Sequence, residues 1–309
     1  MAPRPEKLLL LDSASLYFRA FYGVPDTVKA PDGTSVNAVR GFLDIIAKLV
    51  ATYEPTHIVA CWDDDWRPQW RVDLIPSYKT HRVAEPVENA PDVEVVPDPL
   101  ELQVPVIRET LDALGIAIVG AAEHEADDVI GTLATTADMP VDIVTGDRDL
   151  FQLVDDDRAV RIVYTARGMS NLEIVTDDVV FAKYGVHARQ YADFASMRGD
   201  SSDGLPGVKG IGDKSAASLL AAHGDLGGIV AAARAGEGMP AGQRAKILAA
   251  LDYIAVAPTV VEVVRDLSLA EVPTAIVPLD AERTDAADAL AERWNLTGPM
   301  GRAIAALAR

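Results

Sequence analysis

Acidic residues recur at one kind of position along this 309-residue chain, directly after short apolar segments. Asp12 closes LLLLD, Asp63 closes HIVACWD, Asp147 closes VDIVTGD, and more acids follow the third segment, IAIVG. The carboxyl ends of parallel strands meet at one edge of a sheet, so these side chains should converge there. A single acid of this kind more often caps a helix, but seven at four successive positions indicate a site. The seven are Asp12, Asp63, Glu125, Asp127, Asp128, Asp147 and Asp149.

A group of carboxylates this large needs positive charge, because ionised carboxylates at close range repel one another. Oxygen ligands without Cys or His neighbours suit Mg²⁺ or Mn²⁺, and the five histidines show no metal-ligand spacing. A single Mg²⁺ uses few carboxylates. The number of acids therefore favours two ions about 4 Å apart, which is the arrangement that activates a water and stabilises the leaving oxygen in phosphodiester hydrolysis. The acids predict a two-metal phosphotransfer or phosphodiesterase site.

The segments that position these acids alternate between strand and helix patterns. Apolar runs rich in Val, Ile and Leu predict buried strands at residues 8–12, 57–63, 116–120, 141–147 and 160–165. Amphipathic patterns between them predict helices at residues 38–53, 101–115 and 126–137. Such repetition is typical of an α/β fold with a parallel, twisted, doubly wound sheet. From Thr176 onward only helical patterns follow, so we expect one domain over residues 1–175 and a helical DNA-binding and C-terminal region over residues 176–309.

Residues 64–99 interrupt the alternation and are too long for an ordinary connection. Within them, WRPQWRVDLIPSYKTHR (residues 66–82) carries Arg67, Arg71, Lys79 and Arg82 against Asp73 alone, a local charge of +3 in a chain of formal net charge −19. The segment is either a solvated basic loop or a functional excursion that meets an anion.

A glycine-rich turn lies beside two more acids, Asp200 and Asp203, in RGDSSDGLPGVKGIGDKSA at residues 198–216. The pattern GVxGIG before a helix resembles a helix-hairpin-helix, in which glycines let the backbone approach DNA and helix-start amides meet a phosphate. Such an element needs few basic side chains, here Lys209 and Lys214, and reads no sequence. A plain helix–turn–helix connection is the alternative. The net charge of −19 argues against nucleic acid overall, so any DNA contact must be local.

The whole chain resembles the 5′ nucleases, the family of flap endonucleases and of the 5′→3′ exonuclease domain of bacterial DNA polymerase I. The resemblance is carried by LLLLDSASLYFRA, CWDDD…WRVDLIPSYKTHR, EHEADDVIGTLA, TGDRDLFQL and RGDSSDGLPGVKGIGDKSA. These motifs keep the family's order over about residues 8–220. They imply a PIN-like α/β nuclease core, a helical arch at residues 64–99 and a helix–three-turn–helix duplex-binding element with its hairpin at residues 203–215.

Matched position by position, the resemblance implies two sites for Mg²⁺ or Mn²⁺, with K⁺ at the hairpin as a further candidate ion. The first site would use Asp12, Asp63, Glu125 and Asp127. The second would use Asp149, Asp200 and Asp203, with Asp147 between the two and Asp128 contributing through water. The arch residues implied to meet the scissile phosphate are Lys79, Arg71 and Arg82. The implied DNA contacts are Arg19, Phe21, Gly207, Lys209, Gly210, Gly212 and Lys214.

Some positions depart from the family pattern. Gly204 stands where Asn follows GDxSD, and Phe21 stands where a Tyr that stacks on a terminal base is common. Asp64 and Asp65 leave open which acid of the triplet after Trp62 is the ligand. No liganding acid is missing, so we expect an active enzyme.

Three other functions match part of the pattern. A haloacid-dehalogenase-like phosphatase needs a second Asp two residues after the first, where this chain has Ala14. A PIN-type ribonuclease would share the core without the arch and hairpin. A non-catalytic DNA-binding module would not need clustered acids, which repel phosphate unless cations neutralise them.

The sequence thus predicts a structure-specific 5′ nuclease of DNA replication and repair, acting as a 5′→3′ exonuclease and 5′-flap endonuclease. Its expected partner is duplex DNA with a 5′ end, flap or nick, with RNA in the 5′ strand as a further candidate. The chain holds no polymerase-sized region, and we expect a stand-alone form rather than the excised part of a polymerase. The single Cys61 and the lack of an apolar run near the ~18 residues that span a bilayer lead us to expect a cytoplasmic monomer without membrane contact.

Overall fold

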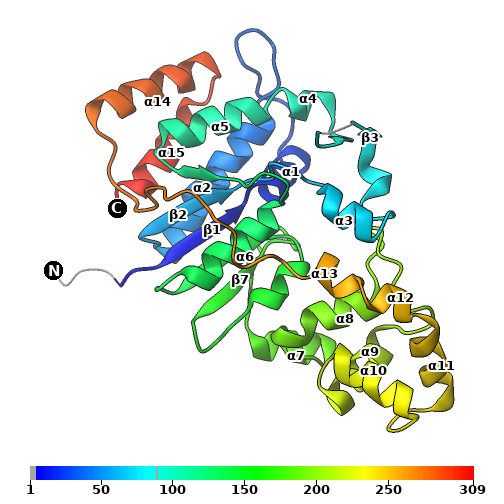
Figure 1. The fold of residues 1–309 in the computed structure, drawn as a ribbon. Helices are drawn as coiled ribbons and strands as arrows, with labels where there is room; N and C mark the ends of the chain where they lie inside the picture. The colour runs from blue at the N-terminus through cyan, green and yellow to red at the C-terminus, as the bar shows by residue number, and fades with distance from the viewer. Residues whose placement is uncertain (1–4, 88–89) are drawn as a thin grey trace.

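The computed structural model describes residues 5–87 and 90–309. Residues 1–4 and 88–89 belong to the predicted first domain, and 88–89 also to the predicted arch; these six positions lie outside the described residues. Figure 1 shows a sheet domain with a group of smaller helices beside it.

A six-stranded sheet forms the centre of the first half of the chain, in the order β5-β2-β1-β6-β7-β8. The strands are β1 (Leu8–Asp12), β2 (His57–Cys61), β5 (Ala117–Val119), β6 (Val141–Thr145), β7 (Val160–Tyr164) and β8 (Glu173–Val175). All neighbouring pairs are parallel except β7 with β8. The predicted parallel α/β fold is confirmed, and each predicted strand is present. The sequence missed β8, because three residues that turn back at an edge carry almost no periodic signal.

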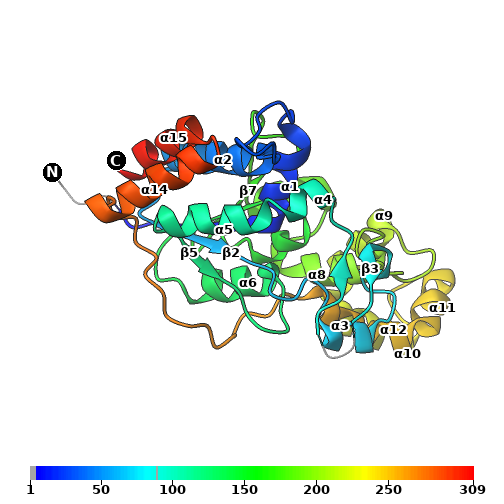
Figure 2. The same ribbon diagram turned by 90° about the horizontal axis from the view of Figure 1, so that it is seen from above.

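Helices cover both faces of the sheet because alternate residues of its strands point to opposite sides. Leu9 and Leu11 of β1 pack with one cluster of helices, whereas Leu8 and Leu10 pack with another. Figures 1 and 2 show the first group above the sheet and α6 below it. The first group comprises α1 (Ser13–Gly23), α2 (Asn37–Tyr53), α4 (Asp98–Glu101), α5 (Val104–Ala113), α14 (Ala281–Arg293) and α15 (Thr297–Leu307). On the other face, α6 (Ala126–Thr136) is followed by η2 (Asp149–Leu153).

Residues 64–99 form the predicted excursion, which is only partly helical. It contains α3 (Gln69–Leu74), η1 (Thr80–Arg82), β3 (Val83–Glu85) and β4 (Val93–Glu94). The last two strands pair antiparallel as a short hairpin. The Pro- and Glu-rich part of the segment favours extended backbone over helix, because proline lacks the N–H that a helix interior needs.

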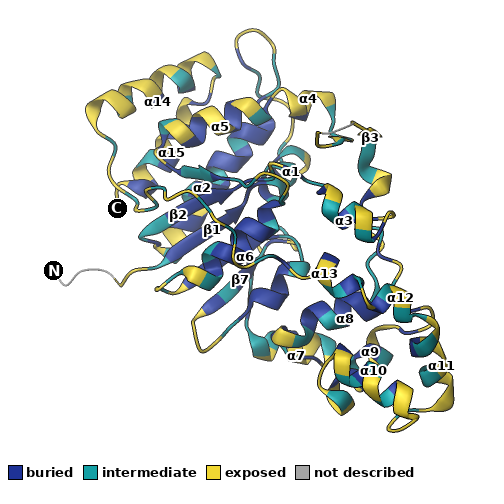
Figure 3. Cartoon of the chain, in the orientation of Figure 1, coloured by how far each residue is buried: buried dark blue, intermediate teal, exposed yellow. Residues whose placement is uncertain are grey.

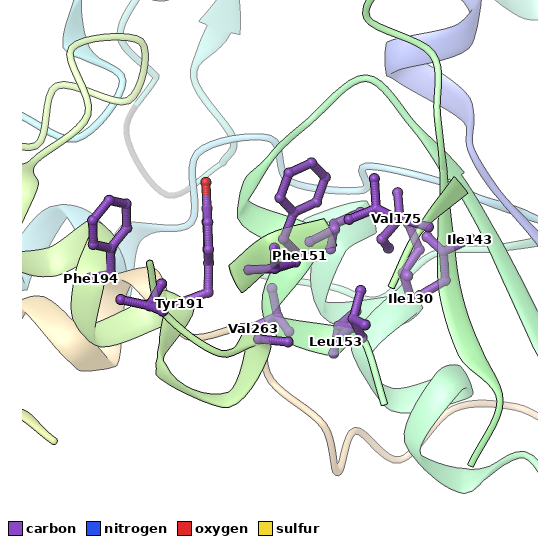
Figure 4. Packing of buried hydrophobic residues seen from close by; sticks show 14 of the residues in the cluster. Ile130, Ile143, Phe151, Leu153, Val175, Tyr191, Phe194 and Val263 are labelled. Carbon is purple, nitrogen blue, oxygen red and sulfur yellow. The ribbon is translucent and has the colours of Figure 1, made fainter. Parts of the chain in front are cut away.

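A group of short helices follows β8 and packs against the sheet through a shared core. Phe151 and Leu153 of η2 lie in one cluster with Tyr191, Phe194 and buried residues of the later helices, and Figure 4 shows Val263 and Ile130 beside them. Figure 3 shows the outer faces of α10 and α11 largely exposed. The helices are α7 (Asp177–Tyr184), η3 (Ala188–Gln190), α8 (Tyr191–Arg198), α9 (Asp213–His223), α10 (Leu226–Ala235), α11 (Ala241–Ala249), α12 (Leu251–Ile254) and α13 (Ala257–Val261).

The chain then returns to the sheet domain along an extended segment, residues 262–276, which we call the return strap. Val264 donates its backbone N–H to Asp128 Oδ1 (2.8 Å), and Ile58 donates its own to the carbonyl of Thr274 (2.8 Å). Beyond the strap, α14 and α15 pack in the apolar cluster that contains Leu9, Leu11 and the buried face of α2, which we call the α2 cluster. Helices α14 and α15 therefore differ from the rest of the predicted region 176–309, since they join the core of the first half. The boundary near residue 175 stays a prediction.

No single helix within the described parts of the chain is long and apolar enough to cross a bilayer; the bent pair α9 and α10 reaches that length and composition only when its two helices are taken together.

The seating of the return strap on α6 depends on Gly131. A Cβ at this position would lie 2.6 Å from the carbonyl oxygen of Val264. Alanine favours a helix interior over glycine by about 1 kcal/mol, yet we expect Gly131→Ala to lower the free energy of unfolding by about 1–3 kcal/mol because it overpacks this contact. Gly301→Ala in α15, where a Cβ has nothing within 4 Å, should instead stabilise. Urea unfolding curves measure both, and equal stability of the two variants would contradict the seating.

Candidate active site

An acidic cavity of about 240 Å³ opens at the carboxyl ends of β1, β2 and β6. This is the edge where the sequence predicts that the strand-end acids converge. Ser15, Phe18 and Glu94 contribute side chains that the sequence interpretation did not select. The predicted residues that line it are Asp12, Asp63, Lys79, Arg82, Glu125, Asp127 and Asp147. A much smaller adjoining cavity, lined by Glu125, Asp127, Asp149 and Asp203, continues the acidic surface.

Local hydrogen bonds hold the acids at the strand ends. Asp12 caps α1 by accepting from the Ser15 backbone N–H (3.2 Å), and it also accepts from Thr145 Oγ1 (2.6 Å). Asp63 accepts from the backbone N–H of Ala126 at the start of α6 (2.8 Å). Asp147 accepts from the backbone N–H of Asp149 (2.8 Å). Asp63 and Asp147 thus each accept through one oxygen and keep the other for another partner, whereas both oxygens of Asp12 accept a hydrogen bond.

The triplet after Trp62 is resolved by these contacts. Asp63 lines the acidic cavity, whereas Asp64 and Asp65 line a different one beside Glu123. Asp65 accepts from the backbone N–H of Arg67 (3.0 Å). Of the three acids, the geometry supports Asp63 as the residue that acts with Asp12.

Burial and mutual repulsion perturb the carboxylates of the cavity. Desolvation by burial, with the charge of Asp63 adding to it, raises the pKa of Asp12 to about 7. Burial followed by the charge of Asp147 raises the pKa values of Asp127 and Asp149 well above the ordinary value. For these carboxyls burial and mutual repulsion outweigh the nearby basic side chains, which is the condition of a site suited to further cations.

Two predicted residues have a different role in the structure. Arg71 is 2% exposed, and its guanidinium donates to both oxygens of Asp128, at 2.8 and 2.7 Å. Asp128 is fully buried and also accepts from the backbone N–H groups of Glu125 and Val264. Asp128 lines neither acidic cavity, and Arg71 lines only the smaller one, where it also donates to Glu125 at 3.0 Å. Both oxygens of Asp128 are occupied and Arg71 is enclosed, so the structure gives this pair a role in holding the fold; Asp128 as a water-mediated ligand and Arg71 as a phosphate contact stay predictions.

Lys79 and Arg82 do face the acidic cavity. The Lys79 ammonium pairs with Glu125, which also accepts from Tyr78 Oη at 2.6 Å. Burial acts to lower the pKa of Lys79, but the charge of Glu125 outweighs it and raises that pKa well above the usual value. Arg82 pairs with Asp203 at 3.2 Å. Both cations are therefore paired with acids: Lys79 is buried, whereas the Arg82 side chain stays 35% exposed.

The predicted ligands are near one another but not gathered around single points. Among residues 5–87 and 90–309, no three acidic, His or Cys side chains are grouped tightly enough to hold one metal ion as they stand. Several are drawn to cations of the chain: Glu125 to Lys79, Asp203 to Arg82, and Asp200 to Arg198 (3.3 Å). Burial acts to raise the pKa of Asp200, but hydrogen bonds from Ser202 and the nearby arginines lower it. Asp200 lines neither acidic cavity.

The donor set nevertheless fits hard divalent cations. All candidate donors are carboxylate oxygens, the hard ligands that Mg²⁺ and Mn²⁺ prefer, and the acidic cavity of about 240 Å³ leaves room for the waters that Mg²⁺ usually keeps. Asp149 Oδ1 is buried with no hydrogen-bond partner. An orphaned buried oxygen of this kind is costly unless a cation or donor meets it.

The predicted duplex-binding element is the turn between α8 and α9. Lys209, Gly210, Gly212 and Lys214 are exposed along it, and a Cβ at Gly212 would meet nothing within 4 Å. Gly207 differs from these residues, because its φ is +65° and a Cβ there would lie 2.6 Å from the backbone of Arg198. The chain's own backbone therefore requires this glycine, and its contact with DNA stays a prediction. The sequence interpretation missed Lys246 of α11, whose ammonium donates to the Gly210 carbonyl (2.8 Å).

The aromatic ring at the acidic cavity belongs to Phe18 rather than to the predicted Phe21. Phe18 lines both the acidic cavity and a neighbouring cavity of about 850 Å³ that contains Arg19. Phe21 packs in the α2 cluster with its ring edge-on to Tyr22. Helical periodicity could have distinguished Phe18 from Phe21. Phe18 lies three residues after Ser15, on the same face of α1, and both line the acidic cavity.

Comparisons with known proteins match nearly the whole chain. Residues 7–185 match the family model described as 5′-3′ exonuclease, N-terminal resolvase-like domain, and residues 186–284 match 5′-3′ exonuclease, C-terminal SAM fold. A 5′-3′ exonuclease of Streptomyces coelicolor is 57% identical, with 97% of this chain and 99% of that protein covered. One of Mycobacterium tuberculosis is 50% identical, with 97% of each covered. DNA polymerase I of the same species is 42% identical over 72% of this chain but 24% of its own length.

Solved structures resemble the fold at low identity. A zinc-bound T5 5′-exonuclease superposes with a TM-score of 0.64 at 16% identity, covering 98% of this chain and 100% of that one. The catalytic core of Rad2 in complex with DNA substrate has a TM-score of 0.57 at 18% identity, covering 98% and 91%. The predicted family resemblance and the predicted fold are confirmed.

The raised pKa of Asp12 predicts how stability depends on pH. The folded protein binds this proton more tightly than the unfolded chain, so Asp12 makes folding less favourable as the pH rises from 3.8 to about 7, at up to about 1.4 kcal/mol per pH unit. In chelator, Asp12→Asn should therefore show a shallower loss of unfolding free energy over this interval and be more stable than the parent at pH 7. Chemical denaturation at several pH values measures the slope. Asp285→Asn, on the exposed side of α14, should keep the parent slope; a parent slope in Asp12→Asn would contradict the prediction.

Proposed function

The chain belongs to the 5′-3′ exonuclease family, and from this premise we propose that it is a divalent-metal-dependent nuclease that hydrolyses DNA near a 5′ end, nick or flap. One observation carries the proposal. Asp12, Asp63, Asp127 and Asp147 line one cavity that Lys79 and Arg82 also enter. Acids alone would repel a phosphodiester, whereas acids that hold cations, with two basic side chains beside them, would attract it.

The residues proposed to hold the ions follow from the two adjoining cavities. Asp12, Asp63, Glu125 and Asp127 would form one site, and Asp149, Asp203 and the more distant Asp200 the other, with Asp147 between them. Two Mg²⁺ or Mn²⁺ ions, when bound, would supply activation of a water and stabilisation of the leaving oxygen. Asp203 first has to exchange its partner Arg82, and Glu125 its partner Lys79 on one oxygen. The other oxygen of Glu125 accepts from Arg71 (3.0 Å) and Tyr78 (2.6 Å).

That exchange gives the two cations of the arch their proposed role. Once released from Glu125 and Asp203, Lys79 and Arg82 would donate to the oxygens of the scissile phosphate and stabilise the charge that develops there. Phe18, at the edge of the same cavity, would support the terminal base by stacking, which is tolerant of base identity.

Duplex binding is proposed for the exposed turn at residues 209–214. Its glycines and the first amides of α9 can approach a phosphate closely, as helix N-termini do. Lys209, Lys214 and Lys246 add local positive charge in a chain of net charge −19. Contacts of this kind are made to the backbone, so binding should not depend on base sequence. Tolerance for RNA in the 5′ strand, K⁺ at the hairpin, a monomeric state and a cytoplasmic location stay predictions.

Cleavage and metal binding are tested together on Asp147. The parent should cleave a 5′-flapped duplex with Mg²⁺ or Mn²⁺. It should not cleave a phosphomonoester, and it should cleave no substrate in chelator. Asp147→Asn should lower cleavage by roughly 10²–10³-fold or more, yet leave the protein in chelator as stable or more so, since it removes one of several repelling charges. Melting curves with and without metal should show that metal raises the parent melting temperature.

The outcome against this proposal is specific. An unchanged parent melting temperature with added metal, combined with an Asp147→Asn variant destabilised in chelator, would identify the acids as structural. Asp285→Asn, an exposed acid of α14, is the matched control and should cleave and melt like the parent.

The duplex contact is tested at Gly212, where a side chain fits the folded protein. Its φ of −107° suits any residue, and a Cβ there has open space. Gly212→Val should leave the fold and the metal response intact, with only the small loss in melting temperature expected when valine replaces glycine at the N-cap of α9, while weakening binding to nicked duplexes of any sequence. Fluorescence anisotropy in chelator measures the dissociation constant. Parent affinity in Gly212→Val would mean that the turn does not contact DNA.

A further inference from the structure

The base of the arch rests directly on the loop that carries Asp200 and Asp203. We call residues 75–82 the arch base and residues 200–205 the acidic loop. The backbone N–H of Lys79 donates to the carbonyl of Asp203 (2.9 Å), and Ser77 Oγ donates to the carbonyl of Gly204 (2.7 Å). Arg82 Nη2 donates to the carbonyl of Ser202 (3.1 Å). Three successive carbonyls of the acidic loop thus each accept from a different residue of the arch base.

Gly204 is the residue that allows this approach. Its φ is +70°, and a Cβ at this position would lie 2.1 Å from the carbonyl oxygen of Ser77 and 3.3 Å from the backbone nitrogen of Lys79. The neighbouring atoms are backbone atoms, so no side-chain rotation can relieve the overlap. In this chain a residue larger than glycine would separate the arch base from the acidic loop or displace both, so the Asn that the family pattern has after GDxSD does not fit the arch base as it lies here.

An apolar cluster supports the contact from behind. Ile75 and Tyr78 of the arch base are buried together with Leu205 of the acidic loop and with residues of α8 and α13. Tyr78 also donates its hydroxyl to Glu125 at 2.6 Å. The arch base follows β2 of the sheet in the sequence. It is nevertheless attached to the helical half of the protein by packing and by hydrogen bonds.

Lys79 lies at the centre of this attachment. Its backbone is left-handed, with φ +47°, an uncommon conformation for a residue other than glycine. It persists because the Lys79 N–H is bonded to Asp203 and the Lys79 carbonyl accepts from the Arg82 N–H (2.9 Å). The same bonds aim the Lys79 side chain at Glu125 and the acidic cavity.

We propose that Gly204 is a positioning residue for cleavage. By admitting the Ser77 carbonyl, it holds the arch base on the acidic loop, so that Lys79 and Arg82 face the acidic cavity before any substrate binds. The role of the two cations in cleavage rests on the proposed function, whereas the docking itself rests only on the contacts described. A cation held in place before the reaction loses no freedom at the moment it is needed, which is how preorganised charge accelerates a step.

Replacing Gly204 by Asn tests the steric overlap of a Cβ separately from the requirement for a left-handed φ. Asn tolerates left-handed φ better than most residues, so Gly204→Asn keeps the conformation accessible while adding the overlapping Cβ. Gly185→Asn is the matched control: its φ is +72°, it ends α7, and its Cβ would lie 3.5 Å from the nearest atom, an ordinary contact. Gly204→Ala carries the same overlap with less bulk and serves if Gly204→Asn folds poorly.

The rate of trypsin cleavage measures how firmly the arch base is docked on the acidic loop, independently of nuclease activity. Lys79 and Arg82 are the trypsin cleavage points within the arch base. We expect cleavage there to be roughly tenfold faster in Gly204→Asn than in the parent, with an unchanged rate in Gly185→Asn, since local opening governs such cleavage. Melting curves of each variant separate local opening from global unfolding. Equal cleavage rates in parent and Gly204→Asn would overturn the proposal.

Kinetics test the link to Lys79. Gly204→Asn should lower kcat on a 5′-flapped duplex by roughly 10–100-fold, the cost of a misplaced reacting group, while KM and duplex affinity stay within about twofold. In a background that lacks both cations, Lys79→Ala with Arg82→Ala, the same substitution should cost less than about twofold, because residues that act through one another are not additive. Effects that multiply fully would overturn the positioning role. A parent without any nuclease activity would refute the proposed function, and the trypsin comparison would still decide the docking.

Discussion

The constraint on which this structure depends is the repulsion among carboxylates gathered at one edge of a sheet. Unit charges about 4 Å apart repel by roughly 4 kcal/mol at an effective dielectric of 20, and burial makes ionisation harder still, as the raised pKa of Asp12 shows. The fold answers with fixed donors: Thr145 Oγ1 to Asp12 and the Ala126 N–H to Asp63. The remaining charge is met by basic side chains that arrive from the arch.

Those basic side chains divide into two kinds. Arg71 is enclosed, and its bonds to Asp128 and to the carbonyl of Val260 join the start of the arch to α6 and to the end of α13. Lys79 and Arg82 remain at the cavity, paired with acids that the proposed mechanism needs for another purpose. One network therefore holds the fold together at its enclosed end and stays available for chemistry at its open end.

The turn proposed to bind duplex DNA is joined to the same centre by a short length of chain. Asp203 belongs to the acidic loop, Gly207 is fixed by the backbone of Arg198, and Gly212 caps the start of α9. Movement of the turn is thus restricted relative to the cavity, which ties the position of bound DNA to the position of the acids. The acidic composition of the chain and its proposed DNA contact are compatible because the two kinds of charge occupy different, adjacent surfaces.

The sequence by itself determined the parallel strands, the fold class, the family and the edge at which the acids gather, because strand periodicity and the place of Asp12, Asp63 and Asp147 at strand ends are local properties of the chain. Only the tertiary structure decided which partner each side chain takes. Arg71 and Asp128 are 57 residues apart and meet as a buried pair, and Gly204 carries its meaning only through the carbonyl of Ser77, 127 residues away. Long-range contacts of this kind leave no periodic pattern. A motif can therefore indicate that a basic or glycine residue matters, whereas the packing of distant segments decides whether it binds a ligand or holds the chain to itself.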